Sequence, residues 1–432
     1  MNKIRNITIT EYGRIYAGDV IDNVQITKED INELKLFIDE NNEKDKSLSS
    51  IEEYLKPIRN GVQANNFVGV LKTKSGLTIE ILPKIANGQH DLNDMKKLFI
   101  KMLSTFKQIN GKAFEMTHLS INDNSLIEIF IAMFLQEVNV IIKRGLKSDY
   151  IVLEQNESYL KGKLNIQKQI QLNSFNKTRF HSKFDEFDIN IPENQIIKST
   201  LLFLKKESKN GHNQKMINMY LHYFDSVSSI RDVDNTFKKI KKNREYAYYD
   251  QSIIWAEIFL KKKSFTSFTG NSLAYALLFP MEKVFESYVA HMIKNHLSNH
   301  EVYLQDSRYY LFDDDGSGNK HYRLKPDMII KNSETKLVTI VDTKWKILNA
   351  NGPAQSDLYQ MYAYNSRYKH YGKDVNKVVL LYPQSNLYNE KVFISKKIGP
   401  NNMENLNSKI EVVFINLFNT SWIEKIKNRI NE

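Results

Sequence analysis

The sequence has no cysteine, so disulfide bonds, thiolate metal sites and thiol nucleophiles are all excluded. It also lacks an apolar run long enough to cross a membrane. The most apolar stretch, residues 125–146, contains Glu128, Glu137 and Lys143, so it fits a buried helix better than a membrane span. Residues 1–13 have no apolar block of the secretory type. These absences favour a cytoplasmic protein that does not engage a membrane.

Two common nucleotide and nucleophile motifs are also absent. No segment has the G-x-x-x-x-G-K-[ST] pattern of a P-loop, and the "GLKS" at 145–148 follows a predicted helix and lacks the upstream glycine. No G-x-S-x-G motif of a serine hydrolase occurs either. We therefore expect no nucleoside triphosphate to bind this chain through a P-loop, and any nucleotide-driven motor to belong to another chain.

Positive charge is in excess. The 61 lysines and arginines outnumber the 50 aspartates and glutamates, which gives a formal net charge of +11 over 432 residues. Basic proteins of this size often bind a polyanion, and nucleic acid is the first candidate. The lysines are spread widely, however, so a basic surface that only interacts with solvent explains the charge as well. Charge alone leaves both interpretations open.

Three regions differ in their residue patterns. Residues 1–105 are β-rich, with alternating apolar runs on both sides of a Ser-Gly pair at 75–76 that predict a hairpin, and with a charged helix at about 28–42. Residues 106–263 have mostly helical periodicity. Residues 264–432 alternate between helices and strands. We expect a multidomain α+β protein with a β-rich amino-terminal domain, a helical middle region and a carboxyl-terminal α/β domain.

The carboxyl-terminal region has the clearest element pattern. Its apolar periodicity predicts helices at 280–297 and 356–368, and strands at 302–312, 321–330, 336–345 and 377–383. Helices that alternate with apolar strands in this way fit a mixed central sheet flanked by helices.

One of these strands ends in two charged residues. Asp342 and Lys344 follow an apolar approach and lie two residues apart, so their side chains project from the same face of the strand. Buried charges are costly unless they are paired or bind a metal. The pair is therefore either a salt bridge at a strand end or half of an active site.

Other polar residues in the same region favour an active site. Glu286 lies on the first predicted helix and Asp327 begins the strand before the Asp-x-Lys triplet, while Gln360 and Tyr364 lie one turn apart on the next helix. Such a set suits metal-assisted hydrolysis of a phosphodiester. Mg²⁺, or Mn²⁺, takes oxygen ligands and keeps several waters, so two or three carboxylates suffice to bind it. A lysine beside the cation can orient or deprotonate the attacking water.

The order of these residues resembles the PD-(D/E)xK nuclease superfamily, in the variety found in RecB-like nucleases. The resemblance implies a restriction-endonuclease-like fold. It also implies that Asp327, Asp342 and Lys344 form the metal site, with Glu286 as a further metal ligand from the helix. Gln360 and Tyr364 match the accessory helix of that variety.

A longer resemblance extends over most of the chain. It is carried by "EYG", "GVLKTKSGLTIEILPKI", "LKGKLNI", "ENQIIKSTLLFL", "FPMEKVFESYV", "LKPDMII", "VDTKWK" and "DLYQMYAY", which are similar to the McrC subunit of McrBC restriction systems. That family implies a DNA endonuclease that depends on modified cytosine in double-stranded DNA, and a partner, McrB, that is a GTP-hydrolysing AAA+ ring. It also implies that residues 1–105 contact and stimulate the partner. Lys72, Lys74 and Lys84 are the basic candidates there.

Two alternatives to a catalytic McrC-type subunit remain at this stage. One is a non-catalytic interaction subunit that activates a partner GTPase, and the other is a stand-alone repair nuclease of the RecB-like kind.

Two metal-like patterns are better explained as structure. Residues 313–318 resemble a calcium loop without its closing glutamate, and His296 and His300 have helical spacing without a third zinc ligand.

Overall fold

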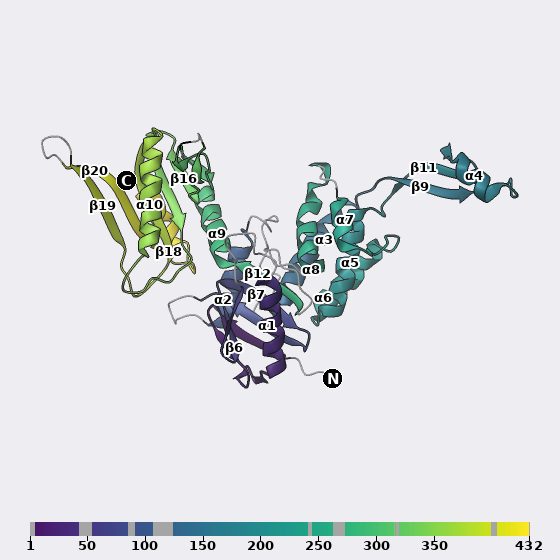
Figure 1. The fold of residues 1–432 in the computed structure, drawn as a ribbon, viewed down its shortest axis with the longest axis horizontal. Helices are drawn as coiled ribbons and strands as arrows, with labels where there is room; N and C mark the ends of the chain where they lie inside the picture. The colour runs from purple at the N-terminus through teal and green to yellow at the C-terminus, as the bar shows by residue number, and fades with distance from the viewer. Residues whose placement is uncertain are drawn as a thin grey trace. The chain divides into compact units, whose positions relative to one another are not determined.

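The computed structural model describes residues 5–42, 54–84, 91–106, 124–240, 244–261, 273–314, 316, 319–398 and 404–431. By contacts the chain divides into two units. The first comprises residues 1–110, 270–273 and 278–432, and the second comprises residues 111–269 and 274–277. The boundary expected near 263 lies outside the described residues. The division into three domains therefore stays a prediction (Figure 1).

The amino-terminal part of the first unit is built on small sheets. A four-stranded sheet has the order β1 (Arg5–Thr10), β8 (Leu77–Leu82), β7 (Phe67–Thr73), β12 (Leu273–Pro280). Smaller sheets join β2 (Arg14–Tyr16), β6 (Gly61–Ala64) and β5 (Leu55–Ile58), and β3 (Val20–Ile21) with β4 (Val24–Gln25). The predicted hairpin at 75–76 is confirmed, because β7 and β8 pair antiparallel around Gly76, which has a φ of +90°. The predicted helix at 28–42 is also confirmed, as α1 (Lys28–Asn42).

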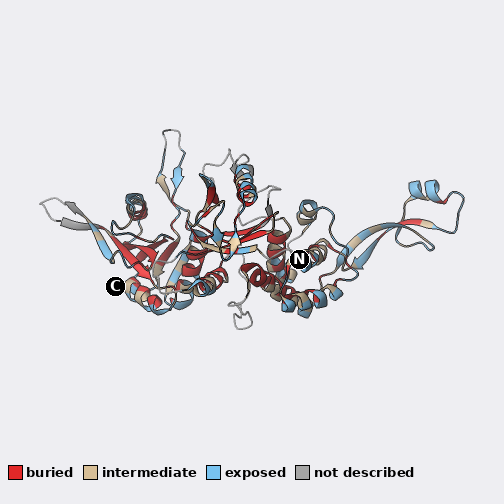
Figure 2. Cartoon of the chain, turned by 90° about the horizontal axis from the view of Figure 1, so that it is seen from below, coloured by how far each residue is buried: buried red, intermediate tan, exposed pale blue. Residues whose placement is uncertain are grey.

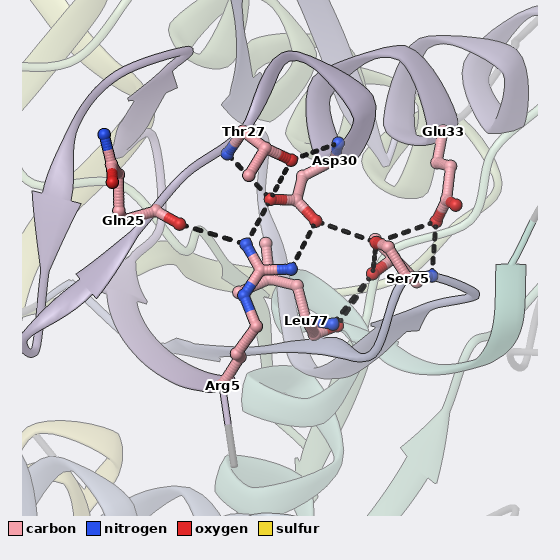
Figure 3. Close-up of polar contacts among 8 residues, drawn as sticks. Arg5, Gln25, Thr27, Asp30, Glu33, Ser75 and Leu77 are labelled. Atoms are coloured by element: carbon pink, nitrogen blue, oxygen red, sulfur yellow. Dashed lines mark hydrogen bonds and ion pairs between the residues drawn. The ribbon is translucent and has the colours of Figure 1, made fainter. Parts of the chain in front are cut away.

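A buried carboxylate fixes the hairpin to the start of α1 (Figure 3). Asp30 accepts hydrogen bonds from the backbone and the hydroxyl group of Thr27, which caps the helix, and from Arg5 and the hydroxyl group of Ser75. The backbone N–H of Ser75 donates to Glu33, one turn further along α1. Burial alone would raise the pKa of Asp30, but its hydrogen bonds, led by that from Arg5, outweigh burial and lower the pKa. The tip of the hairpin is therefore hydrogen-bonded to the first turns of α1.

The carboxyl-terminal part of the first unit contains a mixed six-stranded sheet, as predicted. Its order is β13 (His300–Leu304), β16 (Met328–Asn332), β17 (Val338–Thr343), β18 (Val375–Pro383), β20 (Glu404–Ile415), β19 (Lys391–Ile398). The pairs β17–β18 and β18–β20 are parallel, and the other pairs are antiparallel. Buried residues, red in Figure 2, follow the inner strands of this sheet.

Helices contact the sheet. α10 (Gln355–His370) packs across β17, β18 and β20, where Met361, Tyr364 and Tyr368 join one apolar cluster with Ile340 and Leu380 (Figure 1). α9 (Met281–His296) contacts β17, and α11 (Ser421–Asn431) packs on α9. α2 (Leu92–Leu103) contacts both β8 and α9, so it links the two parts of this unit.

Three sequence predictions for this region were incomplete or wrong. The strand predicted at 302–312 is interrupted after β13, where Gln305 has a φ of +48°, and it resumes as β14 (Tyr310–Phe312). The strand predicted at 321–330 is divided into β15 (His321–Arg323) and β16, because Pro326 lies between them and has no N–H for a ladder. Beyond the strand predicted at 377–383, β19, β20 and α11 follow without having been predicted.

The second unit is mainly helical, as predicted for the middle region. Its helices are α3 (Leu126–Arg144), α5 (Pro192–Glu207), α6 (Gly211–Tyr223), α7 (Val233–Lys238), a 3₁₀ segment (Arg244–Tyr249) and α8 (Asp250–Leu260). The sequence did not predict its three-stranded sheet, which joins β10 (Lys163–Leu164), β11 (Phe180–Asp188) and β9 (Asp149–Glu157), nor α4 (Ile166–Asn173) beside it. These elements are mostly exposed, pale blue in Figure 2, so they lack the apolar alternation that identifies a strand.

No helix in the described part of the chain combines the length and apolar character that a membrane span requires. The longest apolar helix, α3, is instead buried among its neighbours, and its Glu128 accepts hydrogen bonds from Ser208, Asn213 and the backbone of Asn210.

Candidate active site

The Asp-x-Lys pair lies at the carboxyl end of β17, at the edge of an apolar core. Asp342 is the last but one residue of the strand and is only 2% exposed. Lys344 Nζ lies 2.6 Å from Asp342 Oδ2 and donates a hydrogen bond of 3.0 Å to Gln360 Oε1. Gln360 Nε2 in turn donates to the hydroxyl oxygen of Tyr364 at 2.8 Å. The structure therefore brings the predicted residues of β17 and α10 into one chain of contacts.

The second predicted acid reaches the same strand from its neighbour. Asp327 lies directly before β16, which pairs with β17, and Asp327 Oδ2 accepts hydrogen bonds from the backbone N–H and the hydroxyl group of Thr343, both at 2.7 Å. Because Thr343 is the residue after Asp342, these contacts hold the two carboxylates on adjacent strand ends.

The electrostatics show that the two carboxylates repel each other. Burial, together with the negative charge of Asp327, raises the pKa of Asp342 to about 7, although the positive charge of Lys344 opposes the shift. Burial also raises the pKa of Asp327, against the hydrogen bonds from Thr343. A pair of close, buried carboxylates is costly to ionise without a cation, and such pairs are common at functional sites.

The oxygens at this site fit a hard divalent cation. Asp342 Oδ2 is buried, and its contact in the described part of the chain is the ion pair with Lys344. Carboxylate oxygens without histidine or cysteine suit Mg²⁺ or Mn²⁺ rather than zinc. Within the described ranges, however, no three acidic or histidine side chains come close enough to bind one ion together. Asp327 and Asp342 are therefore the candidate ligands, and water would fill the other positions.

Glu286 is connected to this site indirectly. Its Oε1 accepts a hydrogen bond of 2.9 Å from Gln305 Nε2, and the backbone N–H of Gln305 donates to the carbonyl oxygen of Asp327 at 2.8 Å. Gln305 thus contacts Glu286 through its side chain and the backbone of Asp327 through its own backbone. Gln305 was not expected at the site, because its apolar neighbours predicted an unbroken strand there.

A second residue missed by the sequence analysis is Asp357, in the first turn of α10. It is buried and accepts hydrogen bonds of 3.2 Å from Lys346 Nζ and from the hydroxyl group of Tyr382. Its charge raises the pKa of both Asp342 and Lys344. The available signal was its position three residues before Gln360, on the same face of the helix.

The three lysines proposed for partner contact do not form one patch. Lys72 lies in β7 and Lys74 in the turn that follows, whereas Lys84 lies beyond the other end of β8. A strand of that length separates its ends by roughly 17 Å. Any role of these lysines stays a prediction.

Within the described residues, neither metal-like pattern belongs to a group of three side chains that could hold one ion. His296 ends α9, and its ring nitrogen Nδ1 lies 2.8 Å from the carbonyl oxygen of Met292, whereas His300 begins β13. In the loop at 313–318, Asp313 forms an ion pair of 2.5 Å with Arg367; residues 315, 317 and 318 lie outside the described residues.

Comparison with known protein families identifies the chain. Residues 62–383 match the sequence model of a family described as the McrBC 5-methylcytosine restriction system component. Because this match covers more than half of the sequence, the chain belongs to that family, and the resemblance found in the sequence is confirmed. A search of curated proteins gave no match.

Solved structures show the same fold. A chain from the Thermococcus gammatolerans assembly of McrB AAA+ hexamers with bound McrC aligns with a TM-score of 0.70 at 17% identity, and the alignment covers 99% of each chain. A chain from the cryo-EM structure of the Thermococcus gammatolerans McrBC complex aligns with a TM-score of 0.51 at 18% identity, over 68% of this chain and 88% of that one. At these identities the likeness concerns the fold.

Proposed function

We propose that this chain is the McrC-type nuclease subunit of a GTP-driven restriction complex, with a PD-(D/E)xK site that hydrolyses DNA phosphodiester bonds. The observation that supports it most is the meeting of Asp327, Asp342 and Lys344 at adjacent strand ends, beside Gln360 and Tyr364. Family membership supplies the biological setting.

The two carboxylates would hold Mg²⁺ or Mn²⁺. When bound, such a cation lowers the pKa of a water molecule and neutralises charge that develops on the phosphate. Asp327 is oriented for this role by Thr343, and Glu286, which Gln305 links to Asp327, would hold a water molecule rather than the cation itself.

Lys344 would orient the attacking water and stabilise negative charge on the phosphate. Burial alone would lower the pKa of Lys344, but the charge of Asp342 outweighs burial and raises the pKa, so Lys344 is an ammonium group in this arrangement. Its hydrogen bond to Gln360, which is itself bound to Tyr364, restricts the position of the amine. Lys344 could remove a proton from the water only as a neutral amine. That form requires the charge of the neighbouring carboxylates to be neutralised first.

The proposed partner is an McrB-like AAA+ GTPase, and the proposed substrate is double-stranded DNA with modified cytosine. Both follow from the family and from the McrB assemblies that the similar structures come from. The sequence lacks a P-loop, so GTP hydrolysis is assigned to the partner. Residues 1–105 are the proposed partner-binding part. The interaction-subunit alternative differs only in that the carboxylates and Lys344 would then be inactive.

The test is the metal dependence of cleavage. The purified chain is mixed with its partner GTPase, GTP and DNA that contains 5-methylcytosine. We expect cleavage to stop with EDTA and to return with Mg²⁺ or Mn²⁺. GTP hydrolysis is measured in a parallel control reaction. Undiminished cleavage after removal of divalent ions would contradict the site. An absence of cleavage with GTPase stimulation intact would favour the interaction subunit.

A further inference from the structure

A contact between the amino-terminal strands and the candidate active site is not used by the proposed chemistry. Trp345, the residue directly after Lys344, donates its indole N–H to both carboxylate oxygens of Glu11, at 3.1 and 3.0 Å. The two residues are 334 positions apart in the sequence, and both are buried. A charge-assisted hydrogen bond of this kind is among the stronger contacts available to a buried side chain.

The backbone around Glu11 holds its carboxylate in place. Glu11 follows β1, and its backbone N–H donates to the carbonyl oxygen of Leu82 at 2.9 Å. A tight turn comes next, in which Tyr12 has a φ of +61° and the N–H of Gly13 bonds to the carbonyl of Thr10. A Cβ atom on Gly13 would lie 2.7 Å from that carbonyl oxygen, so this position requires glycine. The "EYG" triplet of the sequence is therefore the turn that aims Glu11.

Trp345 is adjacent to Lys344 in the chain and contacts the helix that carries Glu286. It follows Lys344 in the chain, and its ring packs on Phe285, with 5.2 Å between ring centroids, directly before Glu286 on α9. A cavity of about 350 Å³ lies beside it, lined in part by Glu11, Lys84 and Ile347. Packing is therefore incomplete on that side of Trp345, and the bond to Glu11 acts together with the contact with Phe285 to fix the position of the indole ring.

We infer that Glu11 is a positioning residue for the active site, which acts through Trp345 to hold Lys344 and the Glu286 helix in register with Asp342. The inference rests on the proposed function, because Glu11 can position an active site only if this site is the nuclease site. It makes the amino-terminal strands a required part of the nuclease site, because they supply the anchor for the segment that carries the lysine.

The cost of this carboxylate supports a role beyond stability. Burial raises the pKa of Glu11 to about 7, and the charge of Glu282 adds to the shift, while hydrogen bonds from the backbone of Lys84 and from Trp345 and the charge of Lys84 oppose it. An ionised Glu11 therefore destabilises the folded state at pH values above its ordinary range. Residues that reduce stability in this way are found where function requires them.

The test compares two tryptophans that differ in one bond. Trp345→Phe keeps an aromatic ring on Phe285 and removes the donor to Glu11. Trp422→Phe is the matched control, because Trp422 is equally buried and packs on Tyr288 of the same helix, while its indole N–H has no hydrogen-bond partner in the described part of the chain. Glu11→Gln, which keeps the side-chain shape and loses one acceptor, is the third variant. Each is assayed as the full chain with its partner GTPase.

We expect Trp345→Phe and Glu11→Gln to lower kcat for DNA cleavage about tenfold or more, with KM for DNA and the stimulation of GTP hydrolysis unchanged. Trp422→Phe should cleave as the wild type does. Equal cleavage by all four proteins would overturn the inference. So would an equal loss of cleavage, GTPase stimulation and thermal stability in Trp345→Phe, since that would show a merely structural role.

A second measurement separates this inference from the proposed function. Hydrogen–deuterium exchange followed by mass spectrometry reports the amides of residues 343–348 without any need for cleavage. We expect faster exchange there in Trp345→Phe and Glu11→Gln, with exchange in β20 unchanged. If the wild type does not cleave DNA at all, the proposed function fails while this measurement still decides the anchor. Unchanged exchange at 343–348 would remove the anchor even in an active nuclease.

Discussion

Thr343 donates two hydrogen bonds of 2.7 Å to a single oxygen of Asp327, one from its backbone and one from its hydroxyl group. This contact crosses from β17 to the end of β16 and fixes the second acid beside Asp342. The residue between Asp342 and Lys344 in the Asp-x-Lys triplet is therefore part of the site and not a spacer.

Thr343→Val should weaken the site without unfolding it. The valine keeps the shape and the backbone bond but loses the hydroxyl donor, so Asp327 is held less firmly. Partners that orient a ligand typically contribute 10- to 100-fold, so we expect cleavage to fall by about that factor at low Mg²⁺. The control is Thr339→Val, the same change on the same face of β17. Equal losses in both variants would show that the effect comes from the strand and not from Asp327.

Asp342→Asn should alter how stability depends on pH. The pKa of Asp342 is about 7 in the folded chain and near 4 when unfolded, so the unfolded state loses this proton first as pH rises. Stability attributable to Asp342 therefore falls between about pH 4 and pH 7 and stays low above that range. We expect the Tm of Asp342→Asn relative to wild type to rise across that range and then to level off.

The same pair of proteins reports cation binding. Mg²⁺ should raise the Tm of the wild type at pH 8, because a ligand that binds only the folded state stabilises it. Asp342→Asn should show little of this shift. A wild-type Tm that is insensitive to Mg²⁺ and Mn²⁺ at millimolar concentrations would argue against a cation at Asp327 and Asp342.

Gln360→Leu tests whether the accessory helix positions Lys344. The change removes the acceptor of the lysine and the donor to Tyr364, and we expect cleavage to fall about tenfold. The chain offers a close control, because Gln355 makes the same contact with Tyr359 one turn earlier, on the exposed side of α10. Gln355→Leu should leave cleavage unchanged. Similar losses of cleavage in both variants would show that the effect comes from a general change in α10 and not from the contact with Lys344.

Ser75→Ala tests the proposed partner-binding part. The change removes the hydroxyl bond to Asp30 and loosens the hairpin tip, at a cost of about 1 kcal/mol in the free energy of unfolding. We expect weaker stimulation of the partner GTPase, with the Mg²⁺-induced rise in Tm unchanged because the metal site lies elsewhere. Full GTPase stimulation by Ser75→Ala would argue that the hairpin does not contact the partner.

Local patterns in the sequence predicted the parts of the site that depend on spacing. The period of a strand placed Asp342 and Lys344 on one face, and the turn of a helix placed Gln360 beside Tyr364. Contacts between distant segments could not be read in this way. The bond from Trp345 to Glu11 joins residues 334 positions apart, and no local pattern records it.

The fold was predicted to a similar extent. The mixed sheet and the helices α1, α9 and α10 followed from apolar periodicity. The turn at Gln305 did not, since a left-handed backbone at a non-glycine residue leaves no compositional sign. The strands β9 and β11 were missed because exposed residues interrupt both of them, so neither has a continuous apolar face.

The most direct test of the account is Asp342→Ala, with cleavage and GTPase stimulation measured on one preparation. Loss of a metal ligand should reduce cleavage of DNA that contains 5-methylcytosine by about 100-fold or more. The variant should still bind the partner and stimulate GTP hydrolysis as the wild type does, because the proposed partner-binding part is residues 1–105. Cleavage at the wild-type rate, or loss of GTPase stimulation in a variant that folds normally, would contradict the assignment.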